Sequence, residues 1–526
     1  MNYRDQPLVD TLSRLGEAVA GHGPWPRFQT TRAGWRALID SLDASPAWSL
    51  VGLWAERAPN RDVATTHVAL RDDSSGELGV LSVDCLNGGF PSLSRVRPAA
   101  IRLERTIVDM YGVTAEGLTD QRPWIDHGTW GLRRPLSAAP AAGPRDGEEY
   151  PNLPVEGDGL HEIPVGPVHA GIIEPGHFRF TANGETVARL EQRLGYVHKG
   201  IEKAMEGKTP LAAAAFASRI SGDSAVAHSI AFARAVEAAL GLEIPPRAHW
   251  LRACMAELER IANHLGDIGA VCNDAAFAFM LAEMSVLKEK TLRAVDVCFG
   301  HRLMMDRVVP GGVTVDLPMD GAARIQELVG MLRRALPSLV KIYDTKASLQ
   351  DRTQTTGVTA PGLVNRFGAG GHVGRAAGRG QDARRSPAYT PYDDLDFQAP
   401  VLTAGDVNAR VWVRIREVEQ SLDLLDLIVK RMPGTPRAAD GSTPLPLAPL
   451  PAEPKAGEGM ALVESFRGEI MTWVRIGDDG LVARCHPRDP SWFQWPLLEA
   501  CIEGNIVADF PLCNKSFNCS YSGHDL

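Results

Sequence analysis

The spacing of apolar residues divides the chain into a strand-rich region followed by a helical one. In the first region, short apolar runs separated by turn residues predict strands in an α+β domain. These runs lie near 51–54, 63–70 and 79–83. A helix is expected near 98–111, where Glu104, Arg105 and Asp109 have spacings that allow salt bridges along a solvated side.

Further along, apolar residues recur every three or four positions, which predicts long packed helices. The stripes lie near 226–240, 251–268 and 411–425. The later segment 468–480 predicts a strand that runs into a hairpin turn. We therefore expect an α+β fold, in which an N-terminal α+β domain precedes a mostly helical domain with small β elements.

Two proline-rich segments mark the expected boundaries. Residues 133–159 have no apolar period and predict a linker between independently packed units. The expected domains are then 1–132 and 160–526. A second proline-rich segment, 432–459, is interpreted as an insertion within the helical domain.

Composition narrows the class of protein. The net charge of −9 argues against nucleic acid as a partner. The eight cysteines form no C-x-x-C pair, so we expect neither a disulfide framework nor a zinc ribbon, and a reducing cytoplasm fits. No secretory signal and no apolar run of roughly 18 residues is present, so membrane association would have to come through partner proteins.

The most informative segment is the ten-residue turn from Arg219 to His228. Ser221 and Ser224 have the spacing of a C-x-x-C metal-binding turn without its sulfur. A neutral hydroxyl is a poor ligand for a soft or borderline metal, whereas a cysteine thiolate is a strong one. The turn therefore suits a metal site whose ligands are missing.

Several further motifs occur in one order together with this turn. They are Gly166-Pro-Val-His-Ala-Gly, Glu174-Pro-Gly-His177, Leu194-Gly-Tyr-Val-His-Lys-Gly-Ile-Glu-Lys203, Glu257-Leu-Glu-Arg-Ile-Ala-Asn-His264 and Asp509-Phe-Pro511. Together they resemble the large subunit of nickel-iron hydrogenases and the homologous quinone-site subunit of respiratory NADH:quinone oxidoreductase. Residues 90–131 look like the 30-kilodalton subunit of the same complex, and the fusion of both resembles the large subunit of formate hydrogenlyase-type, membrane-bound hydrogenases.

Departures from the hydrogenase pattern concern the metal. The resemblance implies four cysteine ligands, two at Ser221 and Ser224 and two near the carboxyl terminus. There, Cys519 and Ser522 retain at most one sulfur, and a small buried residue is the alternative role for Cys519. We expect no nickel-iron centre, no other directly bound cofactor, and an iron–sulfur cluster in a partner subunit. The chain also stops at Leu526, about where the hydrogenases are trimmed, which predicts no removable extension.

The quinone site of the respiratory relatives is also incomplete. The resemblance implies a histidine in the N-terminal loop and a tyrosine in the helical segment. His169 occupies the first histidine position, but Ile173 stands at the second histidine's place and Gly222 at the tyrosine's place. Quinone therefore remains only an alternative ligand at an altered site.

The remaining candidate residues handle protons. Glu174 matches the carboxylate that moves protons in the hydrogenases, and a buried glutamate with a raised pKa would suit that task. His169 and His228, with His177 and His198, are candidate proton relays because imidazole titrates near neutrality. Arg219 and Asp382 match charged positions near the relatives' active site. Each of these residues has a structural alternative as a capping or hydrogen-bonded side chain.

A hard-metal site is a further alternative, because oxygen and imidazole ligands suit several divalent ions. Its candidate ligands are Asp223, His228, His524 and Asp525.

We expect a large subunit of a membrane-associated, hydrogenase-related oxidoreductase complex without hydrogenase activity of its own. It would lie on the cytoplasmic face of the membrane, docked to an iron–sulfur small subunit and to antiporter-like and other membrane subunits. It would contribute to electron transfer coupled to proton or ion movement. The alternatives are a structural assembly subunit without pocket chemistry and a quinone-reducing subunit with an altered site.

Overall fold

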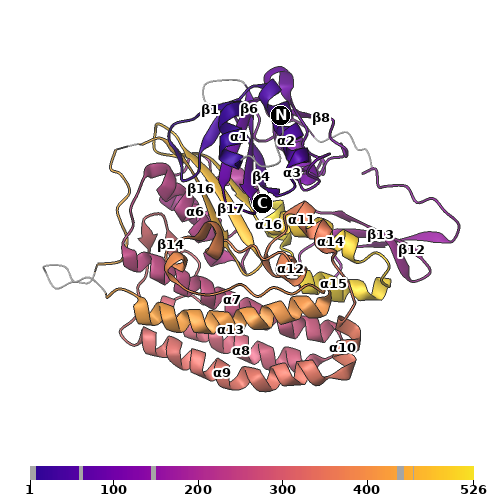
Figure 1. Cartoon of the computed structure of the whole chain (residues 1–526), viewed down its shortest axis with the longest axis vertical. Helices are drawn as coiled ribbons and strands as arrows, with labels where there is room; N and C mark the ends of the chain where they lie inside the picture. The colour runs from indigo at the N-terminus through magenta and orange to yellow at the C-terminus, as the bar shows by residue number, and fades with distance from the viewer. Residues whose placement is uncertain (1–6, 58–62, 144–149, 435–443, 454) are drawn as a thin grey trace.

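The computed structural model describes residues 7–57, 63–143, 150–434, 444–453 and 455–526 (Figure 1). It has the predicted α+β fold, in which a strand-rich N-terminal domain lies against a mostly helical domain. The long helices α7, α8, α9 and α13 form the layer farthest from the N-terminal domain, and a second sheet lies between the two.

The N-terminal domain is built on a five-stranded sheet in the order β1-β3-β6-β5-β4, with β3 and β6 parallel and the other neighbours antiparallel. The three predicted strand runs fall in β4, β5 and β6. The sheet and its helices comprise β1 (Gly16–Ala18), β3 (Arg27–Thr30), β4 (Trp48–Arg57), β5 (Ala64–Asp72), β6 (Leu78–Asp84), α1 (Leu8–Leu15), α2 (Arg32–Ala44) and α3 (Ala100–Tyr111). A short parallel pair, β7 (Gly89–Pro91) and β8 (Thr114–Glu116), completes the domain.

The helix α3 was predicted correctly, but its charged residues are not solvated. Glu104 and Asp109 are buried. Glu104 accepts hydrogen bonds from Ser92 Oγ and the Leu93 amide, and Asp109 Oδ2 accepts from the amides of 124–126. These carboxylates therefore fix neighbouring loops, because the helix is covered on the side that sequence spacing assigned to solvent.

A second sheet joins the two domains. Its strand order is β18-β17-β16-β2, and β2 (His22–Gly23) comes from the N-terminal segment and pairs in parallel with β16. The other strands are β16 (Gly457–Glu464), β17 (Glu469–Ile476) and β18 (Val482–Arg488), so the predicted hairpin near 468–480 is present. One continuous hydrophobic cluster includes core residues of both domains. The domains are therefore not packed independently, contrary to the expectation from the linker.

The helical domain contains the three predicted helices, each longer than its apolar stripe. They are α6 (Ala225–Leu240), α7 (Pro246–Asp274) and α13 (Val407–Arg431), and the bundle is completed by α8 (Ala278–Phe299) and α9 (Gly321–Thr345). α6 packs on β16 and β17, whereas α7 packs between α8 and α13. The shorter helices are α4 (Ile201–Met205), α5 (Pro210–Ala217), α10 (Ala347–Thr353), α11 (Pro361–Phe367), α12 (Gly371–Ala376), α14 (Ser491–Cys501), α15 (Phe510–Phe517) and α16 (Tyr521–Asp525).

The segments expected to be a linker and an insertion carry some regular structure. Residues 133 and 141–142 belong to the small hairpin β9 (Leu132–Arg133) and β10 (Ala141–Ala142). An antiparallel arm follows, formed by β11 (Leu160–Val165), β12 (His177–Asn183) and β13 (Thr186–Arg193), and it projects from the body (Figure 1). In the second segment, Leu447 and Ala448 pair with the hairpin of β14 (Val308–Val309) and β15 (Gly312–Val313), while residues 435–443 and 454 lie outside the described part.

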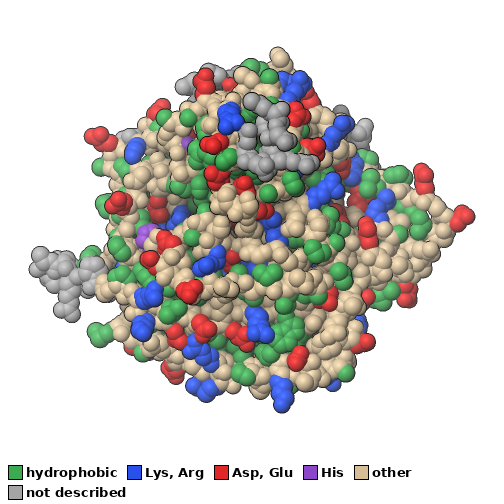
Figure 2. All heavy atoms as spheres, in the orientation of Figure 1, with side chains coloured by type: hydrophobic (Ala, Val, Ile, Leu, Met, Phe, Trp, Pro, Cys, Tyr) green, Lys and Arg blue, Asp and Glu red, His purple; other side chains and the backbone are tan. Residues whose placement is uncertain are grey.

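Acidic and basic side chains are interspersed over the face drawn in Figure 2, without a large patch of one sign. Among the described residues, no helix is both long and apolar enough to cross a membrane.

Candidate functional site

The turn that carries Ser221 and Ser224 connects α5 to α6. Ser221 is buried, and its hydroxyl donates to Asp223 Oδ1 at 2.7 Å. Ser224 is also buried and is the residue before the first turn of α6. The turn therefore has its two serine hydroxyls and the Asp223 carboxylate close together.

The second loop lies between α15 and α16 and carries Cys519 to Ser522. Ser520 begins α16 by accepting a hydrogen bond from the Gly523 amide at 2.8 Å. Its Oγ lies 2.9 Å from Ser221 Oγ and 3.5 Å from Ser522 Oγ. The fold therefore brings the two loops together, and we call the set Ser221, Ser224, Ser520 and Ser522 the serine site.

Arg467, from the turn between β16 and β17, crosses between the two loops. Its guanidinium pairs with Asp223 through both carboxylate oxygens and donates to Ser224 Oγ at 3.0 Å. Its Nε donates to the Asn518 carbonyl oxygen in the second loop. Burial alone would raise the pKa of Asp223, but the Arg467 charge and hydrogen bonds lower it to about 2. Sequence reasoning missed Arg467, because nothing in its local pattern indicates contact with loops about 240 and 50 residues away.

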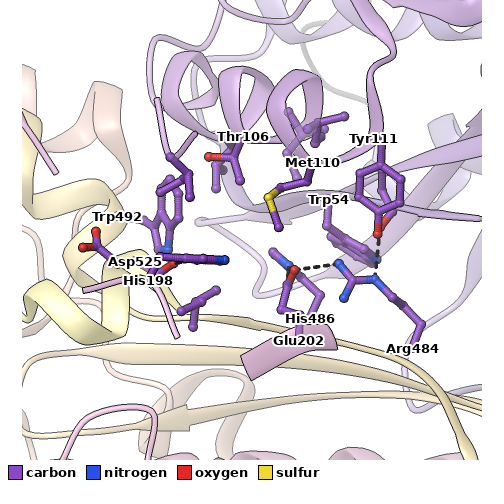
Figure 3. Close-up of a pocket in the computed structure, with 16 residues that line it drawn as sticks. Trp54, Thr106, Met110, Tyr111, His198, Glu202, Arg484, His486, Trp492 and Asp525 are labelled. Carbon is purple, nitrogen blue, oxygen red and sulfur yellow. Dashed lines mark hydrogen bonds and ion pairs between the residues drawn. The ribbon is translucent and has the colours of Figure 1, made fainter. Parts of the chain in front are cut away.

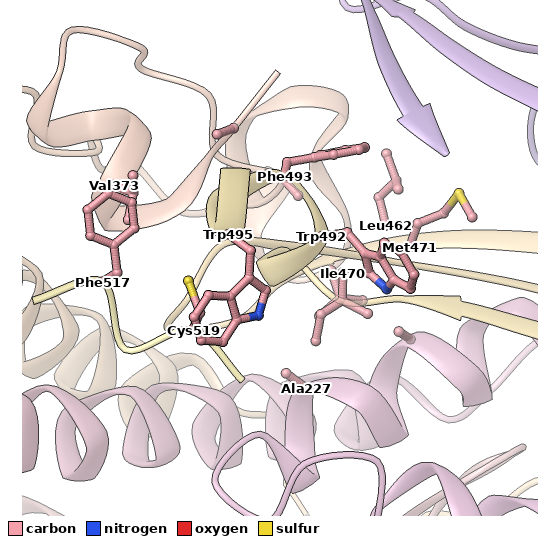
Figure 4. Close-up of a cluster of buried hydrophobic side chains, with 14 of the residues drawn as sticks. Ala227, Val373, Leu462, Ile470, Met471, Trp492, Phe493, Trp495, Phe517 and Cys519 are labelled. Carbon is pink, nitrogen blue, oxygen red and sulfur yellow. The ribbon is translucent and has the colours of Figure 1, made fainter. Parts of the chain in front are cut away.

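Cys519 lies in an apolar setting beside the serine site. It belongs to a buried cluster with Trp495 and Phe517 (Figure 4), and its Sγ is 3.9 Å from Gln494 Oε1. Burial raises the pKa of this thiol well above its ordinary value, so the thiol stays protonated near neutral pH. The environment of Cys519 is that of a small core residue.

This donor set does not fit a nickel-iron centre. Such a centre would need thiolates, whereas the two loops offer hydroxyl oxygens and one protonated thiol, with a guanidinium bonded to both loops. No group of three or more His, Cys, Asp or Glu side chains is placed to hold a metal ion among the residues that the structure describes.

The candidate ligands of the hard-metal alternative are engaged separately. Asp223 pairs with Arg467. His228 Nε2 lies 3.1 Å from Asp489 Oδ2, and Asp489 is a buried partner that sequence reasoning missed. His524 Nδ1 contacts Asp525 Oδ1 at 2.9 Å, and the indole nitrogen of Trp124 donates to His524 Nε2. The hard-metal alternative is therefore not supported by this arrangement.

Glu174 and His169 lie at the edge of the serine site. Glu174 is exposed, and its carboxylate accepts a hydrogen bond from the Ser522 amide at 3.0 Å. The buried glutamate that proton transfer would favour is thus not found in this chain by itself. The ring of His169 is half-buried near Tyr521, with 6.2 Å between ring centroids, and its Nε2 has no hydrogen-bond partner within the described chain.

Gly222 faces a cavity of about 220 Å³ between α7 and α8. A Cβ atom at Gly222 would meet nothing within 4 Å, so the place that the resemblance assigns to a tyrosine is open space. Glu259 also lines this cavity, and burial raises its pKa to about 8 even though it accepts from the Val226 and Ala227 amides.

Arg219 and Asp382 lie away from the serine hydroxyls. Arg219 is exposed and forms a two-pronged pair with Asp306, at 2.6 and 2.8 Å. Asp382 is buried and paired with Arg384 at 2.7 Å. Burial raises its pKa, but Arg384 and Arg375 lower it to about 2, so Asp382 stays ionised at neutral pH. Neither geometry is that of a proton carrier.

Asp382 belongs to a set of buried charges that we call the ion network. Its members are Glu257, Arg260, His264, Arg375, Asp382, Arg384, Glu417 and Glu464. Four carboxylates face three arginines in this set. Burial and the charge of Asp382 raise the pKa of Glu464 to about 7, although Arg375 contacts it at 2.8 Å. Glu464 is therefore the network carboxyl placed to gain and lose a proton near neutral pH.

A further internal cavity lies where the N-terminal domain meets the C-terminal tail (Figure 3). Met110 and Tyr111 of α3 line one side, and Asp525 and Leu526 line another. Glu202 is bound there by Arg484 at 2.8 Å and by His486 at 2.7 Å. This buried ion group joins α4 to β18 beneath the N-terminal domain.

The fold and the two converging loops define a class. An N-terminal α+β domain joined to a helical bundle, with loops of C-x-x-C spacing meeting in its core, is the arrangement of a redox-complex large subunit. Three family profiles match successive parts of the chain. They are the respiratory-chain NADH dehydrogenase 30 Kd subunit at residues 48–142, the nickel-dependent hydrogenase at 199–266, and the respiratory-chain NADH dehydrogenase 49 Kd subunit at 274–525.

Individual relatives agree with these profiles. Hydrogenase-4 component G of Escherichia coli is 32% identical over 84% of this chain and 77% of its own length. Formate hydrogenlyase subunit 5 of the same organism is 30% identical over 85% and 78%. An NADH-quinone oxidoreductase protein of Dehalococcoides mccartyi is 32% identical over 66% of this chain and 92% of its own. The chain belongs to this family of membrane-bound hydrogenase and respiratory NADH dehydrogenase large subunits, with the 30 Kd-type and 49 Kd-type parts fused.

A solved structure shares the fold. A chain of the membrane-bound sulfane sulfur reductase, an archaeal respiratory membrane complex, superposes with a TM-score of 0.65 at 26% identity. The match covers 71% of this chain and 100% of that one.

Proposed function

We propose that this chain is the large subunit of a membrane-associated redox complex and that it holds no nickel-iron centre and turns over no hydrogen itself. The observation that carries the proposal is the serine site, where hydroxyl groups and the Arg467 guanidinium stand in place of a thiolate set. The relatives carry names from hydrogen, quinone and sulfane sulfur chemistry, so one frame is associated with different terminal reactions.

The proposed contribution of this subunit is to couple electron arrival to proton or ion movement. The ion network supports this part, because three arginines cannot neutralise four carboxylates and Glu464 titrates near neutrality. A change of charge at a neighbouring redox group would shift the protonation of such a carboxyl. The partners we propose are an iron–sulfur small subunit and antiporter-like membrane subunits, which would place the chain peripherally on the cytoplasmic face of the membrane.

Metal analysis of the purified native complex tests the first part. We expect iron from the iron–sulfur partner, substoichiometric nickel, and no exchange of H₂ with D₂O. One nickel per complex together with hydrogen isotope exchange would overturn the proposal.

Ion translocation in vesicles containing the assembled complex tests the coupling. Glu464→Gln should lower translocation per electron while assembly persists, and the exposed Glu327→Gln on α9 should leave it unchanged. Unchanged translocation in Glu464→Gln would favour an assembly subunit without pocket chemistry.

Quinone reduction at an altered site is a second candidate, favoured by one observation. The ring of Tyr521 lies beside His169, so a phenol and an imidazole are adjacent even though Gly222 provides no tyrosine. If this pair holds a quinone head group, His169→Ala and Tyr521→Phe should each raise the quinone KM, and a quinone analogue should protect this loop from proteolysis. Identical kinetics in both variants would exclude this pair as the quinone site.

A further inference from the structure

A groove of about 670 Å³ lies away from the serine site, between the N-terminal segment and the start of the bundle. Pro24 and Trp25 form one wall, and Met460 to Leu462 of β16 form another. Arg234 of α6 and His249 of α7 line the groove as well. No residue of the serine site or of the ion network lines it, so the proposed redox role does not account for these side chains.

Arg234 lacks the partners that the other buried arginines of the domain have. Arg252, one α-helix away, makes two bonds to Glu237 and further bonds to backbone carbonyls. Arg234 has no hydrogen bond or ion pair within the described chain, and its Nε is buried without an acceptor. An arginine cannot shed its proton to relieve this situation, so its N–H groups need an acceptor from outside the chain.

The guanidinium is also oriented for recognition. It stacks on the ring of Tyr389, with 4.8 Å from Cζ to the ring centroid. Stacking covers the face of the planar group and leaves its N–H edge for an acceptor in the groove. Two parallel N–H groups match the two oxygens of a carboxylate or phosphate.

The other charges around the groove are compatible with an anion there. Glu237 lines the groove, but its oxygens are occupied by Arg252 and the Gly311 amide. Glu243 lines the groove and Asp393 lies close enough to act on Arg234, and both are exposed and therefore screened by water. Burial and the charges of Arg252 and Arg234 lower the pKa of His249 to about 4, so its ring is neutral at pH 7 and offers a hydrogen bond without charge.

We propose that this groove is a binding site for a small oxyanion, a carboxylate or phosphate group held by the edge of the Arg234 guanidinium with His249 as a second contact. The Trp25 wall leaves room for an apolar or aromatic body attached to the anion. The site belongs to the joint between the N-terminal segment and the helical domain, so a bound anion would strengthen that joint.

Titration calorimetry of the purified protein with inorganic phosphate, and separately with acetate, tests the proposal. We expect one site per chain, and Arg234→Gln should weaken binding at least tenfold because a charge-assisted pair is lost. Arg234→Lys keeps the charge without the fork and should fall in between. Glu243→Gln removes a like charge and should tighten binding about twofold.

The exposed Arg293→Gln on α8 is the matched control and should bind as the wild type does. A second readout does not depend on affinity: phosphate should raise the pKa of His249 in a histidine NMR titration. Equal binding by wild type and Arg234→Gln, or no saturable binding up to about 50 mM, would overturn the proposal. Tighter binding in Glu243→Gln supports it even if Arg234→Gln folds poorly.

Discussion

Replacing Arg467 with methionine should loosen both loops of the serine site at once. The Arg467 side chain is 3% exposed and its partner Asp223 is 38% exposed. The substitution keeps most of the apolar length and removes every bond that the guanidinium makes to Asp223, to Ser224 and to the Asn518 carbonyl. Breaking a buried pair typically costs about 3–5 kcal/mol.

Part of that cost is recovered in this case, because water reaches Asp223 once its partner is gone. We therefore expect about 2–3 kcal/mol of lost local stability, which corresponds to roughly 30–150-fold faster amide exchange in segments that open locally. Hydrogen exchange measured by mass spectrometry should show the increase in 219–224 and also in 517–522, although the two segments are some 300 residues apart in sequence.

The pair of Arg219 and Asp306 provides the matched control. It has the same two-pronged geometry, but its side chains are 49% and 45% exposed. Arg219→Met should change exchange by less than about threefold, because exposed pairs contribute less than 1 kcal/mol. If Arg467→Met accelerates exchange in 219–224 but leaves 517–522 as in the wild type, Arg467 does not join the loops and the reasoning fails.

Three further predictions concern buried ionisable groups and the remaining thiol. The folded-state pKa of Glu464 is about 7 against 4.5 for the free group, so its stabilisation is present below pH 4.5 and is lost as the pH rises through 7. Glu464→Gln cannot ionise, and its free energy of unfolding in urea should fall by about 3 kcal/mol less than that of the wild type across this range; equal slopes would contradict the assignment. For Glu202, burial raises the pKa but Arg484 and His486 lower it to about 2, so its stabilisation is present above pH 4.5 and lost toward pH 2. Glu202→Gln should cost about 3 kcal/mol at pH 7, measured by urea unfolding, and a change below about 0.5 kcal/mol would exclude a structural role for the pair. Cys519→Ala should cost about 1 kcal/mol and leave the metal content of the complex unchanged, whereas loss of a metal would show that Cys519 is a ligand.

Sequence pattern alone gave most of the architecture. The stripes near 226–240, 251–268 and 411–425 became α6, α7 and α13, because their apolar residues repeat with the helical period and point into one core. The helices α8 and α9 were not predicted. Much of the α8 surface is exposed and includes apolar residues such as Val286 and Val297, and α9 contains Pro337, so neither has a clean stripe.

The candidate site was predicted less completely, and the reason is distance along the chain. The convergence of the loops around Ser221 and Ser522 was anticipated from the resemblance, and the structure places Ser221 beside Ser520 between them. Arg467, Asp489 and Glu464 come from separate turns and strands, and their importance depends on burial and on partners that no local pattern encodes. The same limit explains α3, where spacing suggested salt bridges at a surface that the neighbouring loops in fact cover.

The serine site shows how a metal-site frame can persist without metal ligands. In a ligated site, the metal itself would join the turn before α6 to the loop before α16. Here the same junction is made by the contact of Ser221 with Ser520, by Arg467, and by Lys199, whose ammonium binds the carbonyls of Arg219 and Ile220 while its amide binds the Leu526 carbonyl. These bonds need no ion, so loss of the thiolates removes the chemistry of the site without removing the force that closes it. Loop geometry in this family is consequently a poor guide to metal content, and the donor atoms must be identified residue by residue.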